Sequence, residues 1–354
     1  MPATPDAAAL LADPRLTLMG APGSPYTRKM LAVLRYRQLP YRLLVGSNAS
    51  GTGIAGLPVS KVPLLPTFYL PGADGALEAV TDSTPLIRRF ERSHPGRSVI
   101  PGDPALALLD ALFEDYGDEW LTKAMFHYRW TYAADIAKSA AVLPTWSRGP
   151  VDDAALAQAG QAFSQRQIPR LRFVGSNAAT GPVIEAAYLR FLDLFEAHLR
   201  HHRFLLGARP ASGDFGVFGQ LTQLAAFDPT PMAATVARAP RVAGWTFAME
   251  DLSGLEPSDA DWFDPAALPG TVRALLAEIG RTYVPVMLAN ARAVQAGATE
   301  VRADVDGQPW VQQPFPYQAK CLGWLRRDHA ALDAAARARF DAVVAGTGCE
   351  ALFA

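Results

Sequence analysis

Residues 16–45, LTLMGAPGSPYTRKMLAVLRYRQLPYRLLV, decide the fold at the start of the chain. Apolar and β-branched residues bounded by Gly and Pro predict short strands at 16–19 and 41–45. Between them, apolar side chains recur at helical spacing over residues 26–38. The order strand, helix, strand predicts a βαβ unit, followed by a Gly/Ser/Asn-rich loop at 46–56.

Ser24 and Pro25 stand where this helix begins, and two interpretations of Ser24 are open. A serine at the N-cap satisfies free backbone amides, and proline is favoured at the first helical position. The same helix terminus carries partial positive charge, which together with a hydroxyl donor stabilises a bound thiolate or other anion. The sulfur would have to come from a ligand, since the two cysteines of the chain are Cys321 and Cys349.

A β-hairpin is predicted next, because KVPLLPTFYL (61–70) and LEAV (77–80) flank a Gly-bearing turn at 72–75. Pro63 near the start of this hairpin is either a proline tolerated on an edge strand or a cis-proline. In the second case the chain turns sharply and the backbone of Val62 is free to pair with a peptide-like ligand.

The segment TDSTPLIRRFERSHPG (81–96) predicts a helix that begins with small polar residues. Ordinary capping is one interpretation of Asp82 and Ser83. The other is a ligand site, where the hydroxyl and the free amides hold a carboxylate and Asp82 holds an ammonium group. With Ser24, these elements predict a cleft for a small zwitterionic peptide that carries a thiol.

From residue 104 onward the pattern changes to long amphipathic or apolar helices. Residues 105–138 and 182–202 keep helical spacing without strand-like alternation, and 271–293 and 328–353 predict further helices. The expected organisation is therefore α/β plus all-α. We expect domains at 14–98 and 104–300, with a C-terminal extension at 301–354 that packs on the helical domain.

Composition excludes several classes of partner. Of the 354 residues, 33 are Lys or Arg and 34 are Asp or Glu, so no net field attracts nucleic acid or an anionic membrane. We expect a small-molecule partner. The two cysteines form no zinc or disulfide pattern, no metal-ligand spacing occurs, and neither a signal peptide nor a membrane span is evident. We therefore expect a cytoplasmic protein without a metal.

Together these elements resemble the glutathione S-transferase family. The βαβ unit, KVPLL at the hairpin and TDSTPLIRRFE resemble the family's thioredoxin-like glutathione-binding domain, with βαβ-ββα order, and a helical domain follows. The stretch FLLGARPASGDFGVFGQLTQL (204–224) resembles the sixth-helix motif of that domain. The resemblance extends over about residues 16–254.

The resemblance implies a role for each candidate residue. Ser24 would donate a hydrogen bond to the sulfur of glutathione and favour the thiolate. Val62 would pair through its backbone with the cysteinyl part, with Pro63 as the cis-proline. Asp82 and Ser83 would bind the amine and carboxylate of the γ-glutamyl group.

Three further expectations concern the substrates and the assembly. Arg42 and Lys61 are the candidates for the glycyl carboxylate of glutathione. A homodimer is expected from the resemblance. The activated thiolate would attack an apolar electrophile. The alternatives are a glutathione-dependent isomerase, reductase or ether-cleaving enzyme, or a non-catalytic scaffold. A serine at position 24, where a cysteine would form a mixed disulfide, argues against deglutathionylation.

In this family the helix that carries Trp120, His127 and Tyr128 faces the cleft. Core packing is one interpretation of these side chains, and a pocket for the apolar co-substrate, with Tyr26, is the other. His127 is either a proton shuttle or a structural hydrogen-bonding residue.

The chain departs from the family pattern in the sixth-helix motif and in length. Ala211 stands where the family usually has Ser or Thr three residues before Asp214, so the helix cap is missing or shifted to Ser212. An insertion near 143–180 and a Pro/aromatic-rich tail from 301, ahead of a final helix, make the chain longer than usual. The tail would cover the cleft or form a subunit contact.

Overall fold

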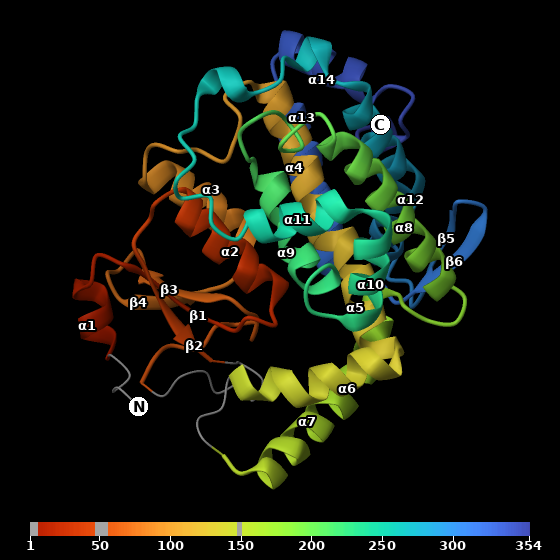
Figure 1. The fold of residues 1–354 in the computed structure, drawn as a ribbon. Helices are drawn as coiled ribbons and strands as arrows, with labels where there is room; N and C mark the ends of the chain where they lie inside the picture. Colours follow the sequence, from red (N-terminus) through yellow and green to blue (C-terminus); the bar gives the residue numbers. More distant parts are fainter. Residues whose placement is uncertain (1–5, 47–55, 147–150) are drawn as a thin grey trace.

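The structure, a computed structural model, describes residues 6–46, 56–146 and 151–354. A small mixed sheet with its helices forms the N-terminal domain, and a larger, mostly helical domain follows (Figure 1). The loop expected at 46–56 lies outside the described residues except for its two ends. None of the described helices is long and apolar enough to cross a membrane.

The N-terminal domain has the predicted βαβ-ββα order. Its four strands lie in the order β2-β1-β3-β4, with β1 and β2 parallel and β3 antiparallel to both of its neighbours. This confirms the thioredoxin-like fold. The elements are β1 (Leu16–Gly20), α2 (Pro25–Tyr36), β2 (Tyr41–Val45), β3 (Thr67–Pro71), β4 (Leu77–Val80) and α3 (Ser83–Ser93).

The sheet buries both of its faces. Neighbouring residues on a strand point to opposite faces, and Leu18 joins the main core whereas Met19 joins a small cluster with Leu10 and Tyr69. Leu10 belongs to α1 (Ala7–Ala12), which lies beside the sheet at the left of Figure 1. The helices α2 and α3 lie on the side of the sheet that faces the helical domain (Figure 1).

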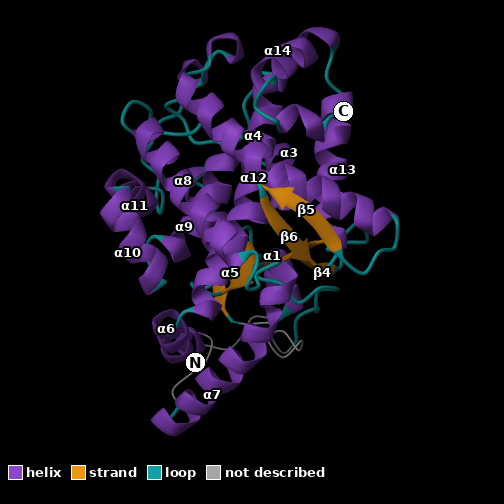
Figure 2. Ribbon diagram, turned by 90° about the vertical axis from the view of Figure 1, so that its right-hand side faces the viewer, coloured by secondary structure: helices purple, strands orange, loops and turns teal. Residues whose placement is uncertain are grey.

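The helical domain is built around α9, which is buried along its whole length. It packs against both α2 and α4, and so joins the two domains. The helices α6 and α7 project together from the bottom of the molecule (Figures 1 and 2). The helices are α4 (Pro104–Tyr116), α5 (Thr122–Thr131), α6 (Ala133–Val142), α7 (Asp153–Gln167), α8 (Gly181–Leu199), α9 (Ser212–Leu224), α10 (Pro229–Arg238), α11 (Pro240–Ala248) and α12 (Gly270–Gln295).

The long helix expected at 105–138 is divided into α4, a π-helical turn (Gly117–Leu121), α5 and α6. The π-turn passes close to α9, because a Cβ on Gly117 would lie 2.6 Å from the backbone of Gly216. Such single-turn π segments are frequent at functional sites. Here the turn carries Asp118 and Glu119, both buried, and Asp118 contacts Lys29 of the N-terminal domain.

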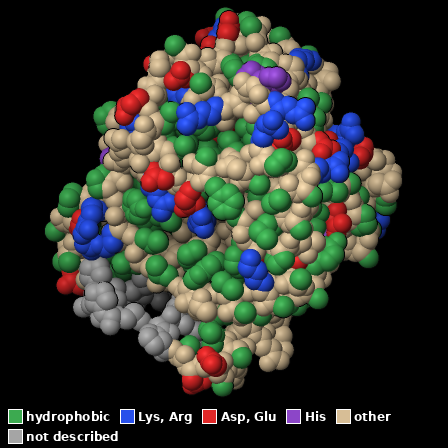
Figure 3. Space-filling view, in the orientation of Figure 1, with side chains coloured by type: hydrophobic (Ala, Val, Ile, Leu, Met, Phe, Trp, Pro, Cys, Tyr) green, Lys and Arg blue, Asp and Glu red, His purple; other side chains and the backbone are tan. Residues whose placement is uncertain are grey.

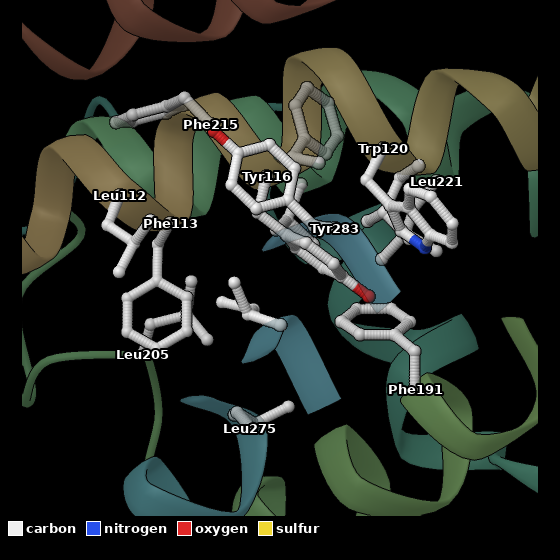
Figure 4. Packing of buried hydrophobic residues seen from close by; sticks show 14 of the residues in the cluster. Leu112, Phe113, Tyr116, Trp120, Phe191, Leu205, Phe215, Leu221, Leu275 and Tyr283 are labelled. Atoms are coloured by element: carbon white, nitrogen blue, oxygen red, sulfur yellow. The ribbon is translucent and has the colours of Figure 1, made fainter. Parts of the chain in front are cut away.

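Aromatic side chains from four helices meet in the centre of the helical domain (Figure 4). Tyr116 of α4 lies with its ring centroid 6.0 Å from that of Phe191 on α8 and 6.3 Å from that of Tyr283 on α12. The ring centroid of Phe215 on α9 lies 5.9 Å from that of Tyr36 on α2. One continuous core therefore extends from the N-terminal helices to α12.

The C-terminal extension differs from its prediction. Residues 301–312 form a hairpin of β5 (Val301–Val305) and β6 (Gln308–Gln312). The prediction of one final helix at 328–353 is wrong. Instead α13 (Pro316–Ala330) ends and α14 (Ala334–Val344) begins after Asp333, which caps the new helix by accepting from the amide of Ala336. The helix α13 packs on α4 and α12. The domain boundaries given above stay predictions.

Candidate functional site

Ser24 caps α2 and also faces a turn of the sheet. Its Oγ accepts a hydrogen bond from the amide of Thr27 at 3.2 Å, so the capping interpretation is confirmed. The same hydroxyl donates to the carbonyl of Leu65 at 3.3 Å. A hydrogen bond of this length is at the weak end of the range, so a ligand atom can replace Leu65 at modest cost. Ser24 is half-buried.

The cis-proline is Pro66, and the expectation of a cis bond at Val62–Pro63 is wrong. The cis peptide bond joins Leu65 to Pro66, directly before β3. Val62 is 53% exposed, and its carbonyl already accepts from the Ser60 hydroxyl at 2.7 Å and from the Leu64 amide at 2.8 Å. Its carbonyl is therefore not free to pair with a ligand as first expected.

Leu65 has the free backbone that was expected of Val62. Among the described residues its amide makes no hydrogen bond, and its carbonyl meets only the Ser24 hydroxyl. Pro66 is the residue immediately before the strand that begins at Thr67, but Pro63 precedes the same strand and the sequence alone does not separate the two.

Asp82 and Ser83 lie where β4 gives way to α3. Asp82 has φ 86°, a conformation that a non-glycine residue adopts only when its surroundings hold it there, at a cost of roughly 1–3 kcal/mol. Its side chain makes no capping bond to α3 and instead accepts a hydrogen bond from Tyr317 at 2.8 Å. Burial raises the pKa of Asp82, and the Tyr317 hydrogen bond acts against that rise. The capping interpretation of Asp82 is therefore wrong.

Ser83 is buried, and its Oγ accepts a hydrogen bond from Nζ of Lys29 at 3.1 Å. Lys29 follows Ser24 by five residues on α2, which is about 7.5 Å along the helix axis. The structure thus brings Ser24, Leu65 and the pair Asp82–Ser83 to one edge of the N-terminal domain. The amide of Ser83, in the first turn of α3, belongs to the set that has no partner within the helix.

Lys29 forms a buried ionic cluster that the sequence analysis missed. Its Nζ donates to Glu114 at 2.8 Å and to Asp118 at 2.6 Å, and the side chain is 0% exposed. Burial by itself lowers the pKa of Lys29, but Asp118 and Glu114 outweigh it and raise the pKa above its usual range. The available signal was a run of five acids within residues 110–119, which includes Glu114 and Asp118 four residues apart.

Asp110 supplies the cap that the sixth-helix motif lacks. Its carboxylate accepts from the amide of Gly213 at 2.6 Å and from the hydroxyl of Ser212 at 2.6 Å. Ser212 is therefore a donor and not the shifted cap. Asp214 accepts from the amides of Ala211 and Leu205, both at 2.9 Å. Burial raises the pKa of Asp110 to about 7 and that of Asp214 to about 8.

The structure places two of the expected pocket residues in the core. Trp120 is 3% exposed and lies with its ring centroid 5.4 Å from Trp310 of the extension. Tyr128 is buried between the rings of Tyr132 and Tyr188, both at 5.7 Å. The expectation that these side chains line a substrate pocket is wrong, because the extension and α8 cover them.

His127 and Tyr26 are also engaged within the protein. His127 is buried, with its ring nitrogens 2.7 Å from Ser176 Oγ and 2.9 Å from Glu185, which supports the structural interpretation and not a proton shuttle. Tyr26 is half-buried and its hydroxyl donates to the carbonyl of Asp118 at 2.7 Å. Tyr26 therefore fastens the start of α2 to the π-turn.

The candidates for the glycyl carboxylate differ in availability. Arg42 is ion-paired with Asp13. Lys61 is exposed on the segment that leads to Leu65. On the face shown in Figure 3, positive and negative side chains are interspersed without a continuous patch of one sign.

The loop before Ser24 is covered by the insertion, which the sequence analysis did not foresee. A Cβ on Gly23 would lie 2.5 Å from Leu143 and 2.9 Å from Trp146, so both side chains contact this loop. Arg129 donates to the Gly23 carbonyl at 3.2 Å. Apolar atoms therefore lie within a few ångströms of the residue that precedes Ser24.

Among residues 6–46, 56–146 and 151–354, no group of three or more His, Cys, Asp or Glu side chains is arranged to hold a metal ion. The chemistry available at this edge consists of hydroxyl, amide and carboxylate hydrogen bonding.

Comparisons with known proteins bear on the family of the chain. Residues 18–98 match the family model "Glutathione S-transferase, N-terminal domain" and residues 153–246 match "Glutathione S-transferase, C-terminal domain". A search of curated proteins gave no match.

Among solved structures, the chain is similar to a glutathione S-transferase from Methylobacterium radiotolerans in complex with glutathione sulfonate. The two are 22% identical over 70% of this chain and 94% of that one, with TM-score 0.39. A glutathione transferase from Burkholderia graminis with two glutathione molecules bound per subunit is 17% identical over 74% of this chain and 88% of that one, with TM-score 0.41.

Proposed function

The chain belongs to the glutathione S-transferase family, and from that premise we propose that it binds glutathione at the edge formed by Ser24, Leu65 and Asp82–Ser83. The bound thiol is activated there for attack on an apolar, electrophilic small molecule. The observation that carries this proposal is the approach of the Ser24 hydroxyl to the carbonyl of Leu65, at 3.3 Å and at a helix N-terminus.

Ser24 acts as a hydrogen-bond donor and not as a nucleophile. When glutathione binds, the hydroxyl exchanges the Leu65 carbonyl for the sulfur, and the Leu65 amide and carbonyl pair with the cysteinyl unit. A free thiol titrates near ~8.5, and the N-terminal end of a helix lowers that value because it favours the anion. A large fraction of bound glutathione is then thiolate at neutral pH.

The γ-glutamyl group lies at the start of α3 in this proposal. The free amide of Ser83 binds its carboxylate, and the Asp82 carboxylate binds its ammonium group. Ser24 and Lys29 fix the spacing between the two ends of the peptide, since both lie on α2 and Lys29 holds Ser83.

The second substrate lies on the apolar side of the loop before Ser24, next to Leu143 and Trp146. The thiolate sulfur donates its electron pair to the electrophilic carbon, a carbon–sulfur bond forms, and the displaced pair leaves with the leaving group or moves into an adjacent acceptor. Both cysteines of the chain are buried free thiols, so the reacting sulfur is that of glutathione. We place the protein in the cytoplasm, as a homodimer.

The test is glutathione binding by calorimetry together with the thiolate absorbance of bound glutathione against pH. For Ser24→Ala we expect the titration of the bound thiol to move toward that of free glutathione and conjugation of a model electrophile to fall about 100-fold. Ser258→Ala is the matched control, because it removes the cap of a short, exposed helix and should leave both readouts unchanged.

A wild-type protein that fails to bind glutathione would refute the proposal and favour a scaffold role. Unchanged turnover in Ser24→Ala would remove Ser24 from the mechanism.

A further inference from the structure

The C-terminal extension reaches the edge where Asp82 lies. Tyr317, in the first turn of α13, donates its hydroxyl to Oδ2 of Asp82 at 2.8 Å, although the two residues are 235 positions apart. Burial raises the pKa of Tyr317, so the phenol keeps its proton and remains a donor.

The first turn of α13 is fastened on two further sides. The buried Asn290 of α12 accepts from the amide of Phe315 at 2.7 Å and donates to its carbonyl at 2.9 Å. Gln318, also buried, donates to the carbonyl of Glu119 in the π-turn at 3.2 Å. Tyr317 lies between these two anchors, so its hydroxyl has a fixed position relative to α3.

Asp82 depends on this contact for its orientation. Its side chain makes no bond to the amides of α3, and among the described residues Tyr317 is the group that donates a hydrogen bond to it. The ammonium group of Lys320, one turn along α13, lies 4.5 Å from the ring centroid of Trp324. In the described part of the chain it forms no ion pair with Asp82. A carboxylate has about four acceptor positions, so Oδ1 is available to a ligand cation.

Resting on the glutathione site proposed above, we propose that Tyr317 is a positioning residue of that site: its hydroxyl holds the Asp82 carboxylate in the orientation that receives the γ-glutamyl ammonium group. The C-terminal extension is then part of the binding site, and it selects ligands that carry an ammonium group at that end.

The experiment compares two ligands on the full-length chain. Dissociation constants are measured by calorimetry for glutathione and for cysteinylglycine, which lacks the γ-glutamyl group. Tyr317→Phe keeps the ring and removes the donor, and we expect it to weaken glutathione about tenfold, as for one hydrogen bond to a charged group, and to leave cysteinylglycine unchanged. In turnover assays KM for glutathione rises and kcat stays unchanged.

Asp82→Asn and the double variant test the coupling. If Tyr317 acts through Asp82, the double variant binds glutathione no more weakly than Asp82→Asn alone. The matched control is Tyr283→Phe, which removes another tyrosine-to-aspartate hydrogen bond, to Asp115, in the core. It should leave both dissociation constants unchanged.

Three outcomes overturn the inference. If Tyr317→Phe binds glutathione with wild-type affinity while Asp82→Asn binds it more weakly, Asp82 works without Tyr317. An equal loss for glutathione and cysteinylglycine shows that α13 is only structural. A wild-type protein that binds neither ligand refutes the proposed function together with the inference, whereas the first two results leave the proposed function intact.

Discussion

Ser24 and Lys29 lie five residues apart on the same helix, α2, and they show two opposite uses of a polar side chain. Ser24 is half-buried, and among the described residues its hydroxyl has one bond outside its own helix, to the carbonyl of Leu65 at 3.3 Å. Lys29 is fully buried, and its ammonium group has three partners, Ser83, Glu114 and Asp118. A saturated buried group stabilises the fold, whereas a weakly bonded group at a half-buried helix end is available to a ligand.

The largest expected effect is that of Lys29→Met. The substitution removes the ammonium group bound to buried Asp118 and leaves Glu114 paired with Arg88. We expect the free energy of unfolding to fall by about 3–5 kcal/mol, measured by urea denaturation. A triple variant that also carries Glu114→Gln and Asp118→Asn should recover most of the loss. A loss below about 1 kcal/mol for Lys29→Met alone would mean that the cluster is not saturated, and the contrast with Ser24 would disappear.

The next effect is a dependence of stability on pH at the cap of α9. Burial raises the pKa of Asp110 to about 7, so the neutral acid is favoured in the fold. A raised pKa contributes stability that is complete below the unfolded pKa, near 4, and is lost as the pH rises through about 7. We expect Asp110→Asn, which stays neutral, to lose less stability than wild type between pH 4 and 7, by on the order of 1 kcal/mol per pH unit, and the two proteins to run parallel above pH 7.

Thermal unfolding of both proteins across that range measures the difference in slope. Parallel curves would show that Asp110 is already ionised in the fold.

Ser24→Ala comes third in its effect on stability. The variant loses one capping bond, so we expect the free energy of unfolding to fall by about 1 kcal/mol, measured by urea denaturation. Its expected effect on conjugation of the model electrophile, described for the proposed function, is larger than its effect on stability. A loss of stability as large as that of Lys29→Met would show that Ser24 has mainly a structural role.

The smallest effect is expected for Val62→Ala. Val62 is exposed and its carbonyl is occupied by Ser60 and Leu64, so we expect less than 0.5 kcal/mol in stability and less than a twofold change in glutathione affinity. Calorimetric titration with glutathione measures the affinity. Because Val62→Ala keeps the backbone, a clear loss of affinity would show that the Val62 side chain itself contributes to the ligand site.

The sequence predicted the elements whose signals are local. The βαβ-ββα order and the start of the helix at Ser24 follow from spacing, Gly and Pro over a few residues. Pro63 and Pro66 both precede β3 within five residues, and no local property decides which one takes the cis form. Which proline faces Ser24 is set by the packing of the turn against α2.

Contacts between segments far apart in the sequence could not be predicted from local patterns. Trp120 and Tyr128 have the same helical spacing whether they face a cleft or the core, and their burial depends on Trp310 of the extension and on α8. The partners of Lys29 lie 85 and 89 residues further along the chain. Charged residues inside an apolar helix nevertheless point to such a cluster before the partner is known.

The hydrogen bond between Tyr317 and Asp82 also has a consequence for the newly made chain. At ribosomal rates of about 5–20 residues per second, Tyr317 is added roughly 10–50 s after Asp82. The sheet and α3 leave the ribosome long before the residue that orients Asp82 exists. For the site as proposed, nascent or stalled chains that end before α13 contain the thiol end without the finished γ-glutamyl end, and we expect tight glutathione binding only after α13 has been made.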